Sequence, residues 1–118
     1  MSKLNSLKKN EDFKIVFNNN KKKLDNNLII FYKKNNLDHL RLGLAISKKI
    51  IKKAVERNKI KRIIREILRK QDIKINYDLV IILSKNFSVK NIYYKKIEES
   101  IIFLLSKIYK DTNEKNHN

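Results

Sequence analysis

Cationic side chains recur at helical spacing in the middle of the chain, in a pattern suited to binding phosphate groups. Arg57, Lys61 and Arg65 are four residues apart, so in a helix they lie on one face. Beside this row the sequence carries an amide and further guanidinium groups: Asn58, Arg62 and Arg69. A guanidinium group presents a planar fork of donors that matches two phosphate oxygens. The pattern therefore predicts a helix face that follows a phosphodiester backbone.

The same sequence offers no arrangement of side chains for catalysis by the protein itself. It contains no cysteine, which excludes disulfides, thiolate metal sites and a cysteine nucleophile. Glu98 and Glu99 are adjacent, so on a helix they diverge instead of converging on a metal ion. His39 and His117 have neither metal-ligand spacing nor a neighbouring nucleophile, and we interpret both as surface histidines. We therefore predict no catalytic residue in the protein, and its metal ligands, if any, stay unknown.

The overall charge indicates a polyanionic partner. Lys and Arg number 29 against 12 Asp and Glu, a formal net charge of +17, while 42% of residues are hydrophobic. That apolar content supports a folded core, and the strongly positive field attracts polyanions. Because lysine is abundant together with Asn and Ile, the clustered arginines carry more weight than the lysine count. The alternative is that the charges only solvate an ordinary helix face, with Glu66 bridging weakly to Arg62 or Lys70.

Hydrophobic periodicity indicates the elements that position these side chains. The basic residues fall in a helix expected over 52–70, whose opposite face carries an apolar stripe of Ile60, Ile63, Ile64, Ile67 and Leu68. Further helices are expected at 10–18 and 92–108, and strands at 28–32, 40–47 and 77–83. Residues 22–24 fit either a loop or a short edge strand. In the 40–47 strand the large apolar residues should face the core and leave Arg41, Gly43, Ala45 and Ser47 on the opposite face.

The chain is expected to form a single domain. It has no proline, one glycine and no linker-like stretch, so we place one domain at 1–110 and a polar, frayed tail at 111–118. The first residues are polar, and no window approaches the length of a membrane span. We therefore expect a cytoplasmic protein with no membrane partner.

Several ordered motifs resemble the bacterial ribonuclease P protein family. They read Arg41-Leu42-Gly43-Leu44, Ser47-Lys48-Lys49, Ala54, Arg57-Asn58-Lys59-Ile60-Lys61-Arg62 and Arg65-Glu66. Upstream, Lys8-Lys9-Asn10, Asp12-Phe13 and Val16-Phe17 resemble the first helix of the family. The likeness spans roughly residues 7–110 in order of elements. Lys59 stands where many relatives carry an arginine, which preserves the charge but not the bidentate fork.

The resemblance implies an α+β fold in α-β-β-β-α-β-α order. Its four-stranded mixed sheet would be similar to a domain found in ribosomal proteins and in translocating elongation factors. The resemblance also implies a protein subunit of ribonuclease P, which assists endonucleolytic removal of the 5′ leader from precursor tRNA. Its partners would be the catalytic RNA and precursor tRNA, and the catalytic centre would lie in the RNA. No cofactor is expected on the protein, whereas magnesium is expected for the holoenzyme.

The family likeness also assigns residues to two surfaces. The catalytic RNA would contact a basic set: Lys48, Lys49, Lys53, Arg57, Asn58, Lys59, Lys61, Arg62, Arg65 and Arg69. The single-stranded leader would lie in a cleft between the first helix and the sheet, against Phe13, Phe17, Tyr32, Arg41, Ser47 and Lys48. Aromatic faces stack on unpaired bases of any sequence, which suits many substrates. The alternatives are core packing for Phe13 and Phe17, and an ordinary solvent-facing strand surface for Arg41 and Ser47.

Two other functions fit parts of the sequence. A ribosomal-type RNA-binding protein without a role in cleavage would share the charge and the fold. A DNA-binding regulator could place the basic helix in a major groove, but the long central strand does not fit a helix-turn-helix unit, so no DNA partner is expected.

Overall fold

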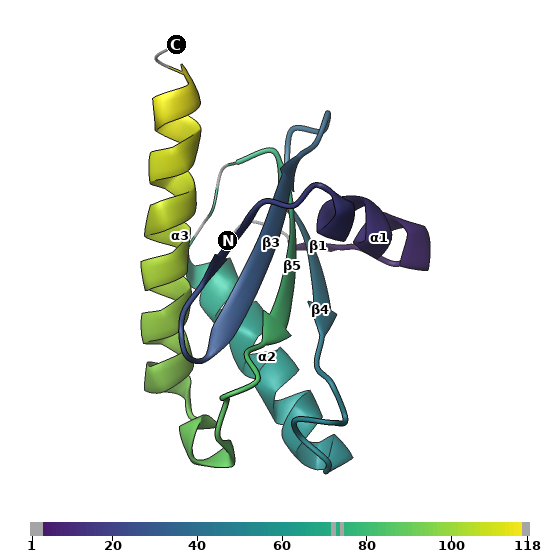
Figure 1. Cartoon of the computed structure of the whole chain (residues 1–118), viewed down its shortest axis with the longest axis vertical. Helices are drawn as coiled ribbons and strands as arrows, with labels where there is room; N and C mark the ends of the chain where they lie inside the picture. Colours follow the sequence, from purple (N-terminus) through teal and green to yellow (C-terminus); the bar gives the residue numbers. More distant parts are fainter. Residues whose placement is uncertain (1–3, 72, 74, 117–118) are drawn as a thin grey trace.

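In residues 4–71, 73 and 75–116, which the computed structural model describes, five strands form one mixed sheet (Figure 1). The strands are β1 (Asn5–Ser6), β2 (Lys22–Leu24), β3 (Leu28–Lys34), β4 (Arg41–Ala45) and β5 (Tyr77–Leu83). Their spatial order is β1-β4-β5-β3-β2. Strand β5 runs parallel to β4 and antiparallel to β3, while β2 pairs antiparallel with β3 at one edge and β1 pairs parallel with β4 at the other.

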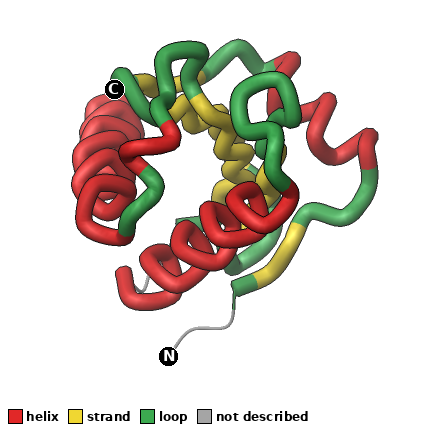
Figure 2. Tube along the Cα trace, turned by 90° about the horizontal axis from the view of Figure 1, so that it is seen from below, coloured by secondary structure: helices red, strands yellow, loops and turns green. Residues whose placement is uncertain are grey.

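Helices cover both faces of this sheet. The helices are α1 (Asn10–Asn18), α2 (Ala54–Gln71) and α3 (Tyr94–Asn116), with a short 3-10 helix η1 (Val89–Asn91) before α3. Helices α2 and α3 pack against each other on one face, and α1 lies on the other face (Figures 1 and 2). The basic helix and the first helix are therefore separated by the thickness of the sheet.

The main core lies between the sheet and helices α2 and α3. Alternate strand residues enter it, among them Ile30, Leu42, Leu79 and Ile81, and they meet the apolar stripe of α2. All five stripe residues predicted from the sequence are buried. Strand β5 contributes to both faces, since Val80 belongs to a second cluster under α1. Because β5 is covered on both faces, its sequence is nearly continuously apolar.

The second core is smaller and lies under α1. Val16 of α1 is fully buried against Val80, and Phe13, Phe17 and Phe31 pack around them while staying partly exposed. The helix approaches β4 at Gly43, where a side-chain carbon would lie 2.6 Å from Cε1 of Phe13. Glycine is required here because the Phe13 ring occupies the space that a side chain would fill.

The structure confirms the predicted α+β class and mixed sheet, with one strand more than expected. Strand β1 is the addition; its two polar residues lack any alternation that a sequence pattern could detect. The short edge strand at Lys22–Leu24 is present. Strand β4 ends at Ala45, earlier than predicted, because Ile50 and Ile51 both donate backbone hydrogen bonds to the carbonyl of Ser47 and turn the chain.

The polar C-terminal segment is helical where a frayed tail was expected. Helix α3 continues to Asn116, and its late turns are tied to the sheet. Asp111 accepts a hydrogen bond of 2.8 Å from the Tyr32 hydroxyl, and the Thr112 hydroxyl lies 3.3 Å from the Tyr77 hydroxyl. Residues 117 and 118, including the predicted surface histidine His117, lie outside the described residues. Among the described helices, none has the length and apolar character needed to cross a membrane.

Candidate nucleic-acid interface

Helix α2 presents the predicted basic face to solvent. Its exposed side chains include Asn58, Lys59, Arg62, Arg65 and Arg69, while Lys61 is half-buried. Within the described part of the chain these arginines form no salt bridge, and the one ion pair on this helix joins Glu66 to Lys70 at 3.7 Å. Their guanidinium donors therefore remain available to an external anion. The weak Glu66 pair predicted from the sequence is confirmed for Lys70, not for Arg62.

Arg57 differs from the other arginines because it is used inside the protein. Its Nη1 donates hydrogen bonds to the carbonyls of Ile51 and Lys52, at 3.0 and 2.8 Å. These bonds hold the segment that enters α2, and they leave the side chain only half-exposed. Arg57 thus positions the basic loop before the helix, and part of its donor capacity is already engaged.

The segment from Ser47 to Lys53 is a turn at the end of β4, not a strand. The Ser47 hydroxyl accepts a hydrogen bond of 3.1 Å from the backbone of Lys49. Lys48, Lys49 and Lys53 are all exposed there, next to the first turn of α2. The structure therefore brings these three lysines together with the basic face of α2, as the sequence predicted. Ser47 and Lys48, which were also expected to line the cleft under α1, lie in this turn instead.

An aromatic cluster forms on the opposite face of the sheet, where α1 meets β3. Phe17 and Phe31 pack edge to face with ring centroids 4.8 Å apart, and Phe13 packs in the same group of side chains. The ammonium group of Lys22 lies 5.6 Å from the Phe31 centroid, in cation–π contact. Each of the three rings keeps part of its surface open, so the cluster combines packing with an accessible aromatic face. Phe31 was missed at the sequence level.

The prediction that Tyr32 lies beside Phe13 and Phe17 is wrong. Successive residues of β3 point to opposite faces, so Phe31 joins the aromatic cluster and Tyr32 enters the main core, where it is 2% exposed. Its ring lies 6.1 Å from that of Tyr77, and its hydroxyl donates to Asp111. Burial, together with that hydrogen bond, raises the pKa of Tyr32. Strand alternation along 28–34 could have shown that Phe31, not Tyr32, belongs with Phe13 and Phe17. It places Phe31 on the face opposite to buried Leu28, Ile30 and Tyr32.

Arg41 is paired inside the protein. Its Nε and Nη2 donate to the two carboxylate oxygens of Asp78 at 2.8 and 2.6 Å, and Asn35 donates a third bond of 2.8 Å to this carboxylate. Arg41 and Asp78 are neighbours in the β4–β5 register, on the face that α1 covers. Burial alone would raise the pKa of Asp78, but the hydrogen bonds from Arg41 and Asn35 and the nearby positive charge outweigh it and lower the pKa. Asp78 was not predicted from the sequence, because one acidic residue in an apolar run carries no pairing signal.

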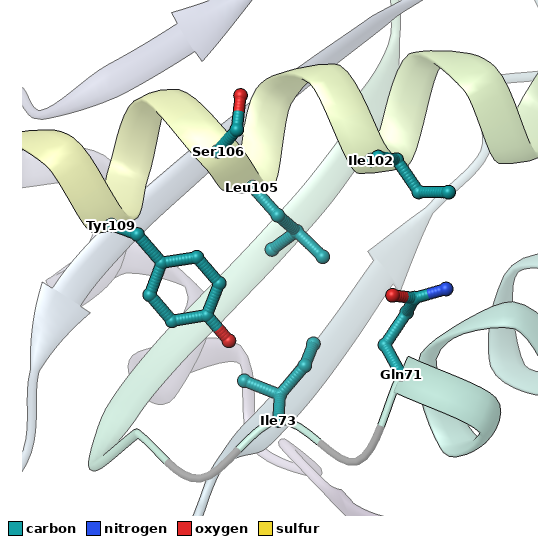
Figure 3. A pocket seen from close by; sticks show the side chains of 6 residues that line it. All are labelled: Gln71, Ile73, Ile102, Leu105, Ser106 and Tyr109. Carbon is teal, nitrogen blue, oxygen red and sulfur yellow. The ribbon is translucent and has the colours of Figure 1, made fainter.

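The pocket between the end of α2 and α3 has no basic side chain in its lining. It has a volume of about 220 Å³ and is lined mainly by apolar side chains, with Tyr109 and Leu105 pointing toward Ile73 (Figure 3). Among the described residues, no group of three His, Asp or Glu side chains could hold a metal ion. His39 is partly exposed and lies 3.0 Å from Asp38, its neighbour in sequence.

The geometry defines a small α+β protein with a basic helix on one side of its sheet and an aromatic cluster on the other. The family model described as "Ribonuclease P" matches residues 1–109. The ribonuclease P protein component of Fusobacterium nucleatum is 40% identical over 111 residues, covering 89% of this chain and 99% of that protein. The component of Alkaliphilus metalliredigens is 36% identical, covering 92% of this chain and 96% of that protein.

Solved structures agree with these sequence relatives. The RNase P protein from Thermotoga maritima superimposes with a TM-score of 0.76 at 31% identity, covering 86% of this chain and 96% of that one. The Staphylococcus aureus RNase P protein gives a TM-score of 0.72 at 29% identity, covering 87% and 94%. The chain belongs to the ribonuclease P protein family.

Proposed function

We propose that this protein binds the catalytic RNA of ribonuclease P and the 5′ leader of precursor tRNA, and so assists removal of the leader. As a ribonuclease P protein it is a component of an endoribonuclease complex. The observation that carries the finer proposal is the division of two surfaces between opposite faces of one sheet. Two ligands can then be held at once without competing for the same side chains.

The basic face of α2 is assigned to the catalytic RNA. Three exposed arginines of α2 form no salt bridge with the residues that the structure describes, and exposed Lys48, Lys49 and Lys53 precede them. This arrangement fits a folded RNA whose phosphates lie at several heights along the helix. Arg57 acts here mainly by holding the loop. Lys59 is exposed on the same helix and supplies charge without a bidentate fork.

The aromatic cluster is assigned to the leader. Phe13, Phe17 and Phe31 offer partly open rings, and Lys22 adds a cation beside them. Stacking is worth about 1–3 kcal/mol per base and tolerates any base. Arg41 contributes less than the sequence suggested, since Asp78 engages two of its donor atoms.

Hydrolysis is assigned to the RNA subunit and its magnesium ions. The described residues offer no cluster of metal ligands, so no chemical step is assigned to a metal held by this chain. The protein's residues would act by neutralising phosphate and by orienting the leader, which raises productive binding of the substrate.

The test mixes the purified protein with a bacterial ribonuclease P RNA and precursor tRNA at near-physiological magnesium. We expect leader release that requires both macromolecules. Tight RNA binding without any stimulation of cleavage would favour the ribosomal-type alternative. Cleavage by the protein alone, lost on mutation of one of its carboxylates, would contradict the assignment of hydrolysis to the RNA.

A further inference from the structure

A second cationic surface lies at the β2 edge of the sheet, away from the basic face of α2. Two surface pockets of about 240 and 290 Å³ occupy this corner. Their lining contains six lysines, which we call the lysine corner: Lys21, Lys23, Lys33, Lys34, Lys107 and Lys110. They come from β3, from β2 and the residue before it, and from α3, so the fold gathers residues that are far apart in sequence.

One carboxylate lines these pockets, and it is already engaged. Asp111 accepts the Tyr32 hydroxyl at 2.8 Å and lies 3.9 Å from the ammonium group of Lys21. The pair lies between the two pockets, since Lys21 lines one and Asp111 the other. The corner therefore keeps a large excess of positive charge. An excess of like charge on one surface is unfavourable until anions neutralise it, so the corner is suited to a chain of phosphates.

The lysine corner adjoins the aromatic cluster across a single strand. Lys22 of β2 lies over Phe31 on the α1 side, whereas Lys23 points to the α3 side and lines a pocket with Lys107 and Lys110. Strand β2 is the last strand of the sheet, and one strand is about 5 Å wide. A single-stranded nucleic acid that leaves the aromatic cluster over this edge meets the corner directly.

We propose that the lysine corner binds the phosphates of the distal, 5′-terminal part of a long precursor-tRNA leader after the leader has crossed β2. The proposal rests on the proposed function, because it extends the path of the leader from the aromatic cluster. The corner contributes affinity that depends on leader length and on salt, not on base sequence.

The test compares two charge-matched triple variants in the reconstituted holoenzyme. The corner variant is Lys23→Gln, Lys107→Gln and Lys110→Gln; it retains Lys21, so Asp111 keeps its cation. The control variant is Lys85→Gln, Lys90→Gln and Lys95→Gln, three exposed lysines after β5, in η1 and at the start of α3. Each holoenzyme is titrated with precursor tRNA bearing a leader of about 4 or about 16 nucleotides, which bracket the site sizes of single-strand-binding domains.

We expect the corner variant to lose about tenfold in affinity for the long-leader substrate, with a salt slope reduced by about 2. The short-leader substrate should bind all three proteins alike, and the control variant should match the wild type on both. Equal losses on both leaders, or equal effects of the two variants, would overturn the proposal.

Weakened assembly with the catalytic RNA in the corner variant would assign the corner to that RNA instead. If the wild-type protein stimulates no cleavage, the proposed function fails first and this proposal with it; normal stimulation without a leader-length effect overturns the corner alone.

Discussion

Gly43 sets how closely the first helix can approach the sheet. A Cβ at this position would lie 2.6 and 2.7 Å from two ring carbons of Phe13 and 3.1 Å from Cδ1 of Leu7. Contacts this short force the Phe13 ring to move. The single glycine of the chain therefore controls the geometry of the aromatic cluster.

Gly43→Ala should destabilise the protein by about 1–3 kcal/mol, as overpacking does in a filled core. The measurement is the urea midpoint followed by circular dichroism. In a Phe13→Leu background the same substitution should cost clearly less, because the smaller side chain relieves the clash. An unchanged cost in that background would show that Phe13 is not the obstacle.

The ion pair between Arg41 and Asp78 is a second feature that depends on individual residues. The side chain of Asp78 is 8% exposed and that of Arg41 29%, so the pair is shielded from water. Removing one partner leaves the other charge poorly solvated, which costs more than the pair contributes.

Asp78→Asn should lower the free energy of unfolding by about 2 kcal/mol at neutral pH. The folded-state pKa of Asp78 lies below its unfolded value, so the stabilisation is present above about pH 4 and is lost as pH falls through the folded pKa. The variant should therefore lose less stability than the wild type on acidification. Parallel pH profiles of the two proteins, measured by denaturant unfolding, would contradict this role.

At the scale of elements, the alternation of β3 places one aromatic side chain at the surface and the next one in the core. Phe31 faces the aromatic cluster and Tyr32 faces the core, although they are adjacent in sequence. The backbone thus assigns one aromatic residue to a wet, partly exposed face and the other to the packing of α3 against the sheet.

Phe31→Ala should weaken binding of the leader-bearing substrate by about 1–3 kcal/mol, the contribution of one stacked base. Tyr32→Phe should leave that binding unchanged and cost about 1 kcal/mol of stability through loss of the hydrogen bond to Asp111. Binding is measured on precursor tRNA with and without its leader, under conditions where both variants are folded. A larger binding loss from Tyr32→Phe would reverse the assignment.

Helix α2 joins a buried apolar stripe to an exposed basic face, so charge can be removed from it without opening the core. The combined change Arg62→Gln, Arg65→Gln and Arg69→Gln should reduce the salt slope of catalytic-RNA binding by about 3. Leader-dependent binding should change little, and thermal stability should be retained. Arg57→Gln is the contrasting variant: it should lower stability, because Ile51 and Lys52 lose their donor.

At the scale of the whole molecule, a net charge of +17 on a 118-residue chain opposes the compact state. The charges gather on α2 and the loop before it and in the lysine corner, and few carboxylates are near enough to pair with them. The folded protein is therefore expected to gain stability whenever anions collect on its surface.

Raising sodium chloride from low ionic strength to about 0.15 M should increase the melting temperature by a few degrees, since exposed charges more than about 8 Å apart are then largely screened from one another. Inorganic phosphate at equal ionic strength should raise it further, because its anions bind the guanidinium groups directly. Differential scanning calorimetry measures both effects. A fall in melting temperature with salt would mean that attractive pairs outweigh self-repulsion.

Local patterns in the sequence determined most of the elements and the basic helix face. The period of apolar residues identified the α2 stripe, and arginine spacing on that helix follows from its pitch alone. The two-residue β1 and the helical continuation past Asp111 were not predictable, because bonds to residues far away in the chain hold them. The turn that ends β4 rests on local backbone bonds to the Ser47 carbonyl, and no Gly or Pro marks it in the sequence.

Only the tertiary structure decided which side chains from different elements share a surface. The pairing of Arg41 with Asp78, the exchange of Tyr32 for Phe31 and the gathering of the lysine corner all depend on strand register and on the placement of α1 and α3. Composition and local spacing specify what each segment can form by itself. Contacts between segments far apart in the chain specify which chemical groups meet, and these contacts exist only once the sheet is assembled.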